Sequence, residues 1–201
     1  MADRTDFEFS PQIETHPFPP FIPEGAKVLI MGTFPPQRKR WAMEFYYPNR
    51  TNDFWPVMGL IFLGNKDALY NRTTKCFDLQ EIKRLLTEKG IAMSDTGYRI
   101  KRLKGNASDK FLEIVEPAPL SDLLKRMPLC RGIATTGEKA AGVLAALTDT
   151  QAPKIGEFVA SPGGIELWRM PSTSRAYPLS VEKKAESYEK MFRHLGLLDP
   201  S

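Results

Sequence analysis

The fold is decided by the stretch Val28-Leu29-Ile30-Met31-Gly32-Thr33-Phe34-Pro35-Pro36, in which four apolar residues end abruptly at a turn of Gly and Pro. A continuous apolar run of this length is typical of a central parallel strand that is covered on both faces. Similar short runs that end in polar turns recur at 91–95, 132–136 and 165–170. We therefore expect four buried strands.

Helical patterns alternate with these strands. Five segments have helical spacing or capping residues: 54–61, 78–90, 120–127, 138–147 and 180–196. Asp78 with Glu81 forms a capping box, and Ser180 is a suitable N-cap for the last helix. Strands that alternate with helices imply a mostly parallel sheet with helices on both faces. The sequence predicts an α/β fold, a three-layer αβα sandwich around a mostly parallel four-stranded sheet.

The chain length favours one domain. With 201 residues it is long enough to bury a sizeable core, and no linker divides it. Residues 1–25 contain five prolines and no periodic pattern, so we expect an extended arm that is packed on the surface or partly disordered. The domain is expected to cover 26–201.

Composition excludes several classes of protein. No apolar run approaches the roughly 20 residues that span a bilayer, and the acidic, Pro-rich start is not a signal peptide. We therefore expect a cytoplasmic protein with no membrane partner, and a monomer. The two cysteines, Cys76 and Cys130, are predicted to be reduced and buried, and two are too few for an iron–sulfur cluster. The two histidines lie in the arm (His16) and the last helix (His194), which argues against a His-based triad or metal site. No metal and no cofactor are expected.

The net charge of +4 permits an anionic partner. Two basic clusters lie beside candidate site turns: Arg38-Lys39-Arg40 and, in an expected loop, the stretch 99–104. Such clusters are what a phosphate backbone favours, although solvated loop charges are an equally good explanation for either one.

Three segments together carry a family resemblance: Gly32-Thr33-Phe34-Pro35-Pro36, then Tyr46-Tyr47-Pro48-Asn49-Arg50-Thr51-Asn52-Asp53-Phe54-Trp55, and finally Met170-Pro171-Ser172-Thr173-Ser174. Over about residues 28 to 174 the chain resembles the uracil-DNA glycosylase superfamily. The likeness is greatest to the mismatch-specific uracil/thymine branch and the hypoxanthine-DNA glycosylase branch. The first and last turns follow strands, where open α/β sheets bind ligands.

The resemblance implies a base-binding site made of Gly32, Thr33, Phe34, Tyr47 and Asp95. Relatives in the mismatch-specific branch position the attacking water with an Asn at the third place of the Gly-turn. That place holds Phe34 here, which cannot hold a water. The hypoxanthine branch also lacks a polar residue there, and a downstream Asn is proposed to compensate.

The residue that matches this compensating Asn is Asn52, with Asn49 as second choice; these are the catalytic candidates. The alternative is that Asn52 only caps the helix that begins near Phe54. Phe54 and Trp55 themselves are expected in the core.

Tyr47 matches the aromatic residue that stacks on a flipped base, although Tyr46 is adjacent and an ordinary half-buried tyrosine is the alternative. Asp95 ends its strand where uracil- and thymine-cleaving relatives read the base edge with an Asn. An ionised Asp only accepts hydrogen bonds, which favours a base that presents a ring N–H. A cap on the turn after the strand is the alternative role for Asp95.

The C-terminal turn is expected to hold DNA, because Ser180 leaves the hydroxyls before it free for phosphates. Uracil-specific relatives have a His in place of Met170. Directly after this turn, at the place of Arg175 and Tyr177, relatives insert a wedge into the gap that the flipped base leaves. The predicted DNA-binding residues are Met170, Pro171, Ser172, Thr173, Ser174 and Arg175.

Together these features predict a metal-independent DNA glycosylase of base-excision repair. It would hydrolyse the N-glycosidic bond of a flipped uracil, thymine or hypoxanthine, in a duplex or single strand. The alternative is a catalytically silent nucleic-acid-binding relative. A small-molecule nucleotide enzyme is a third option, but the sequence has no G-x-x-x-x-G-K-[ST] phosphate loop.

Overall fold

The computed structural model describes residues 12–104 and 109–199. Its central sheet has the strand order β5-β2-β8-β10-β9. The strands are β2 (Val28–Gly32), β5 (Ile91–Asp95), β8 (Gly132–Thr135), β9 (Glu157–Ala160) and β10 (Glu166–Arg169). The first four strands in this order are parallel, and β9 is antiparallel to β10 at the edge. The predicted strands are confirmed, and β9 is an additional one.

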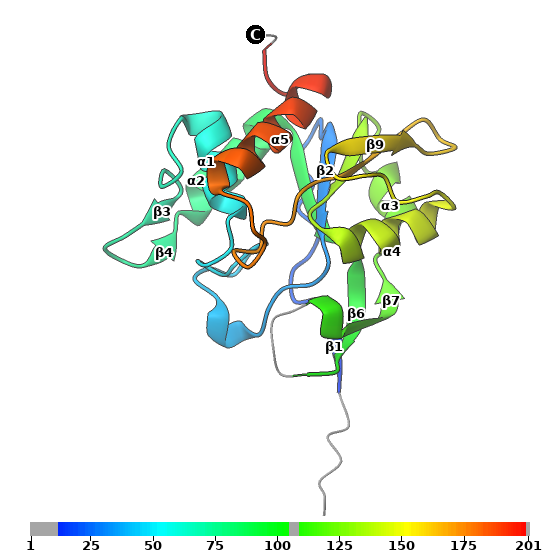
Figure 1. Ribbon diagram of the computed structural model, residues 1–201, viewed down its shortest axis with the longest axis horizontal. Helices are drawn as coiled ribbons and strands as arrows, with labels where there is room; N and C mark the ends of the chain where they lie inside the picture. Colours follow the sequence, from blue (N-terminus) through cyan, green and yellow to red (C-terminus); the bar gives the residue numbers. More distant parts are fainter. Residues whose placement is uncertain (1–11, 105–108, 200–201) are drawn as a thin grey trace, which may run out of the picture.

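Helices cover both faces of this sheet, which confirms the predicted α/β sandwich (Figure 1). One face carries α1 (Phe54–Leu63), α2 (Leu79–Lys89) and α5 (Val181–His194), and the other carries α3 (Leu120–Lys125) and α4 (Glu138–Thr148). Val28 and Ile30 of β2 pack with the first group, whereas Leu29 and Met31 pack with the second. Successive side chains of a strand point to opposite faces, so β2 contributes to both cores.

The expected helix boundaries are present. Asp78 Oδ1 accepts a hydrogen bond from Glu81 N at 3.0 Å, and Ser180 Oγ accepts one from Lys183 N at 3.2 Å. Gly90 ends α2 in the left-handed conformation with φ +68°. Phe54 and Trp55 are buried as predicted.

A second sheet is the main difference from the sequence-based expectation. It joins β1 (Ile13–Thr15), β6 (Gly97–Arg102) and β7 (Leu112–Pro117), all antiparallel. The basic stretch 99–104, expected as a loop, therefore lies mostly in β6. Part of the arm forms β1 although its sequence shows no strand periodicity. Both were missed because pairing with distant segments, and not local sequence, makes them strands.

The prediction of two buried thiols is wrong for Cys76. It lies in a hairpin of β3 (Tyr70–Asn71) and β4 (Cys76–Phe77), where Phe77 points into the core and Cys76 consequently points to solvent. Cys130 is partly buried, and burial raises the pKa of its thiol to about 11. Both cysteines are free thiols. No helix among the described residues is long and apolar enough to cross a bilayer.

Candidate active site

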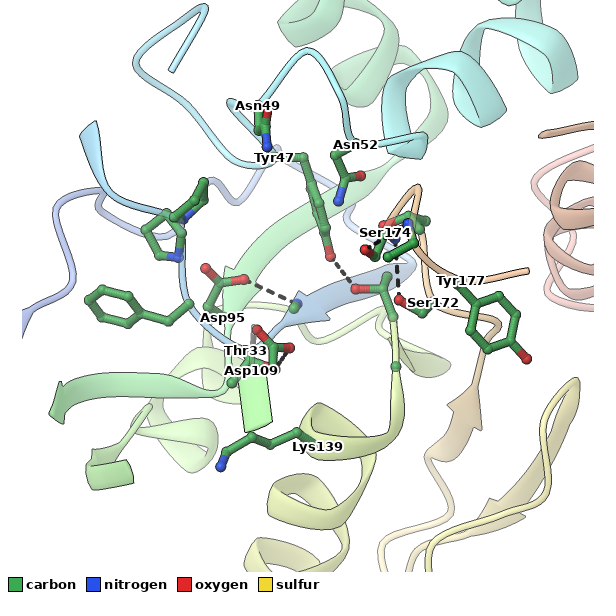
Figure 2. A pocket seen from close by; sticks show the side chains of 18 of the residues that line it. Thr33, Tyr47, Asn49, Asn52, Asp95, Asp109, Lys139, Ser172, Ser174 and Tyr177 are labelled. Carbon is green, nitrogen blue, oxygen red and sulfur yellow. Dashed lines mark hydrogen bonds between the residues drawn. The ribbon is translucent and has the colours of Figure 1, made fainter. Parts of the chain in front are cut away.

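A cavity of about 1100 Å³ opens at the carboxyl ends of the parallel strands. Its walls come from the turns after β2, β8 and β10 and from the segment before α1 (Figure 2). In Figure 2, Tyr47, Asn49 and Asn52 lie on one side of the cavity, and Asp95 and Asp109 lie on another. This is the position at which open α/β sheets bind their ligands.

The segment before α1 and the turn after β10 lie far apart in the sequence, but they are hydrogen-bonded to each other. Asn52 and Ser174 form an isolated antiparallel bridge, and Asp53 N donates to the Thr173 carbonyl oxygen at 2.8 Å. The turn after β10 and the segment before α1 therefore form one continuous wall of the cavity.

A buried ion pair supports this wall. The Asp53 carboxylate accepts from Lys184 Nζ of α5 at 2.7 Å and from Arg175 Nε at 3.2 Å. The Lys184 side chain is 0% exposed, and its ammonium group also donates to the Ser174 carbonyl oxygen at 3.0 Å. A buried charge needs partners, so the Lys184 ammonium group keeps its contacts to Asp53 and Ser174. These contacts hold both segments in place. Nothing in the sequence distinguishes Lys184, since at its position in α5 it resembles any charged residue on a helix.

Tyr47 is held rigidly in the cavity wall. Its backbone is left-handed (φ +51°), its ring stacks on Phe54 with centroids 3.9 Å apart, and its hydroxyl lies 2.6 Å from Thr136 Oγ1. Burial raises the pKa of the Tyr47 phenol well above its usual range, so the ring stays neutral. Phe54 covers one face, so only the opposite face and the ring edge can meet a ligand.

Gly32 is required by close packing at the floor of the cavity. A Cβ at this position would lie 2.7 Å from Asp95 Oδ1 and 3.0 Å from the Tyr47 hydroxyl. The Gly32 N–H donates to Asp95 Oδ1 at 3.1 Å. The absence of a side chain thus lets the ends of β2 and β5 and the Tyr47 ring meet.

Asp95 is not a free acceptor. Its second oxygen, Oδ2, lies 2.9 Å from His16 Nε2, and both side chains are under one-tenth exposed. His16 follows β1, so pairing of the N-terminal arm with β6 brings it to Asp95. The sequence indicates only that His16 lies in the arm, because nothing local predicts a contact with a residue 79 positions away.

Asn52 has one side-chain hydrogen bond and an available amino group. Its Oδ1 accepts from Phe54 N, two residues ahead, at 2.9 Å, but the N-cap of α1 is Asp53, so the alternative that Asn52 is the N-cap is wrong by one position. The bond fixes the orientation of the amide, and no described residue accepts a hydrogen bond from its NH₂ group, which remains available to a ligand. Asn49 is occupied locally, because its Oδ1 accepts from the backbone N–H (3.1 Å) and the hydroxyl (2.9 Å) of Thr51.

Side chains from other segments contact the Gly-turn and hold it in place. Phe34 packs edge-on against His16, with ring centroids 5.2 Å apart, and lies below the Arg102 guanidinium. Thr33 Oγ1 donates to Asp109 Oδ2 at 2.7 Å. Asp109 begins the short 3-10 helix η2 (Asp109–Phe111) and lines the cavity, although no motif in the sequence marks it as a site residue. Asp109 is exposed as a whole, but its carboxyl group is turned inward, and desolvation there raises its pKa.

The predicted DNA-binding turn divides into buried and accessible residues. Met170, Pro171 and Thr173 are buried, so their side chains support the turn and cannot reach a phosphate. Ser172, Ser174 and Arg175 are the accessible ones. The two serine oxygens accept from Ser174 N (3.2 Å) and Ala176 N (3.3 Å), which leaves their O–H donors free. The backbone N–H groups of Ser174 and Ala176 are therefore occupied and cannot donate to a phosphate.

The stretch 99–104 is largely neutralised by acidic partners. Arg99 lies 3.5 Å from Glu116, Lys101 lies 3.9 Å from Glu113, and Arg102 lies 2.8 Å from Glu14. Arg102 is buried and also donates to the Pro35 carbonyl oxygen at 2.7 Å, which fixes the Gly-turn. In the other cluster, the 3-10 helix η1 (Arg38–Arg40), Arg40 is exposed and lines the cavity. Among the described residues, no three His, Cys, Asp or Glu side chains are grouped so that they could hold a metal.

The comparisons with known proteins agree with this architecture. The chain is similar to a solution NMR structure from Methanosarcina acetivorans described as "a putative Uracil DNA glycosylase". The TM-score is 0.66 at 25% sequence identity, and the match covers 92% of this chain and 99% of that one. No family model and no curated protein matches the chain. The similarity supports the uracil-DNA glycosylase superfamily and does not distinguish its branches.

Proposed function

We propose that this chain is a DNA glycosylase that removes a deaminated or mismatched base, namely uracil, thymine or hypoxanthine, for base-excision repair. In the reaction, water adds to C1′ of the flipped nucleotide while the N-glycosidic bond breaks and the base departs with its electron pair. The deoxyribose becomes cation-like, so the site needs to aim a water and to tolerate negative charge on the base.

The observation that carries this proposal is the single wall formed by the segments around Asn52 and Ser174. The Asn52–Ser174 bridge and the bond from Asp53 N to the Thr173 carbonyl oxygen join a polar, aromatic-lined cavity to an exposed Ser- and Arg-bearing turn. A flipped nucleotide needs these two things at one place: a pocket for the base and donors for the flanking phosphates.

Within this cavity, Asn52 is assigned to position the water. Its amide orientation is fixed by the bond to Phe54 N, and its NH₂ group and the second lone pair of Oδ1 can hold the water. Tyr47 is assigned to stack on the base, because it is rigid and has one face free of Phe54. Stacking on such a ring contributes about 1–3 kcal/mol per base. Asn49 is a poorer candidate for the water, since its oxygen already accepts two local hydrogen bonds.

The phosphates are assigned to accessible donors at the mouth of the cavity. The Ser172 and Ser174 hydroxyls, the exposed Arg175 and Arg40 line the cavity and can reach a backbone outside it. Arg99, Lys101 and Arg102 are left out of this assignment, because each of them is paired with a Glu side chain.

A catalytically silent nucleic-acid-binding protein is the second candidate function. Phe34 favours it, because the third place of the Gly-turn offers no polar group and its ring packs on His16. In that case the scaffold and the exposed serines would still hold DNA.

A strand-nicking assay separates the two candidates. Duplexes with one uracil, one hypoxanthine or one mispaired thymine are incubated with excess protein, and abasic sites are then cleaved with alkali. The proposal expects cleavage at the marked position of at least one duplex. Binding to all three duplexes without cleavage of any would support the silent binder.

A further inference from the structure

The floor of the cavity contains a buried histidine–carboxylate pair. The His16 backbone N–H donates to the Tyr98 carbonyl oxygen at 2.8 Å, which continues the pairing of β1 with β6. This contact holds the imidazole against Asp95, with Nε2 to Oδ2 at 2.9 Å and side chains 6% and 8% exposed. Asp95 lines the cavity and His16 lies behind it.

The geometry admits two protonation states of this pair. In the first, His16 Nδ1 carries a hydrogen and donates it to the Phe18 carbonyl oxygen 2.9 Å away. Nε2 and Oδ2 are also 2.9 Å apart, so a second proton then lies between them. In this state the pair holds two protons and has no net charge, whether it is an imidazolium with a carboxylate or an imidazole with a carboxylic acid.

The surroundings accommodate a second state with one proton fewer. The Phe18 backbone N–H lies 3.2 Å from the same Nδ1 and can donate to it once its hydrogen has left. In that state the remaining proton stays on Nε2, and Asp95 keeps a full negative charge. The Phe18 carbonyl oxygen thus accepts from Nδ1 in the first state, and the Phe18 N–H donates to Nδ1 in the second.

Aromatic side chains enclose the imidazole. Tyr46 stacks on it with centroids 5.6 Å apart and an interplanar angle of 26°, and Phe18 and Phe34 meet it edge-on. Aromatic faces attract a cation. The other charged or titratable groups near the pair are Glu14 and Arg102 of the second sheet, Asp109 of η2, and the phenols of Tyr46 and Tyr47.

We propose that His16 is a positioning residue that keeps Asp95 without net charge, so that the base can leave as an anion. This rests on the proposed function. The departing base gains negative charge beside the floor of the cavity, and a bare carboxylate in a desolvated site would oppose it. The two-proton pair removes this repulsion while Asp95 still holds the Gly32 N–H.

The proton count can be measured without any enzyme activity. The chain has two histidines, so a nitrogen NMR spectrum of the imidazoles contains two ring systems, and His194→Gln assigns them. The expected result at neutral pH is a protonated His16 Nδ1. An unprotonated Nδ1 with a proton only on Nε2 would overturn the proposal, because Asp95 would then keep its charge.

The effect on catalysis is tested with His16→Gln, which retains a donor for Asp95 but cannot add a proton. Single-turnover excision should fall by about tenfold or more while the Kd for DNA is unchanged. His194→Gln is the matched control, since His194 forms a similar 2.9 Å pair with Glu166 at the opposite end of the sheet strands, and its rate should be unchanged.

A rescue experiment distinguishes whether His16→Gln lowers the rate through the charge of Asp95 or through altered packing. Adding Asp95→Asn to His16→Gln removes the negative charge and should restore part of the lost rate. A double variant no faster than His16→Gln would contradict the proposal. A wild type that excises no base would instead refute the proposed function, and the nitrogen spectrum would still decide the proton count.

Discussion

Replacing Asn52 separates its structural role from its proposed catalytic one. Asn52→Ala removes the 2.9 Å bond to Phe54 N at the start of α1, which should cost about 0.5–2 kcal/mol of stability. A domain that starts with only about 5 kcal/mol would then keep about 3 kcal/mol and stay about 99% folded. Unfolding therefore cannot lower activity noticeably.

Loss of a positioned water should, in contrast, lower single-turnover excision by about 10² or more. Asn52→Ser is the matched control, because a serine hydroxyl can accept from the N–H two residues ahead but has no amide NH₂. The assay compares excision rates and urea unfolding for both variants. We expect the Ser variant to keep its stability and to lose its rate. Wild-type excision by Asn52→Ser would refute the catalytic role and leave Asn52 with only its structural bond to Phe54 N.

Three further perturbations test the packing around the site. Lys184→Met should lower the free energy of unfolding by about 3–5 kcal/mol, because it leaves the buried Asp53 carboxylate with Arg175 as its single partner. A stronger contact from Arg175 to Asp53 would reduce this loss. Gly32→Ala should lower stability by about 1–3 kcal/mol and abolish excision, because the new Cβ lies 2.7 Å from Asp95 Oδ1 and forces it to move. At pH 8 a thiol with a pKa of about 11 is only about 0.1% thiolate, so Cys130 should be alkylated far more slowly than it is near pH 11, as measured by peptide mass mapping.

Each of these variants has a control in the same chain. Lys183→Met removes an exposed pair with Glu186 and should change stability by about 1 kcal/mol or less. Gly142→Ala places a Cβ in open space on α4 and should be neutral or stabilising. Equal losses for Lys183 and Lys184, or for Gly32 and Gly142, would contradict the packing described above. Fast alkylation of Cys130 at pH 8 would contradict its burial.

The sequence indicates the central sheet well because its strands are short continuous apolar runs. Val28 to Met31 must be buried on both faces wherever they lie, and the capping residues Asp78 and Ser180 act within one turn of their own helices. Local physical chemistry is therefore sufficient for these elements. It is insufficient for β1 and β6, whose polar residues become strands only because they pair with each other across the fold.

The sequence predicted only those residues of the candidate site that belong to the motifs. Tyr47, Asn52, Asp95 and Ser172 all line one cavity, as expected from the positions of strand ends. The sequence could not indicate that His16 pairs with Asp95 or that Lys184 is buried on Asp53, since each contact joins residues about 80 or more positions apart. Burial of Met170 and Thr173 was also invisible, because a turn dense in Pro and hydroxyls usually lies at the surface.

Release of the free base tests the central claim most directly. Excess protein is incubated without added metal with duplexes that carry one uracil, hypoxanthine or mispaired thymine, and the small-molecule fraction is analysed by mass spectrometry. The account predicts the intact free base of at least one duplex, in an amount equal to the abasic strand, and a loss of both with Asn52→Ala. Release of a nucleoside or nucleotide, or no release from any duplex that the protein binds, would contradict it.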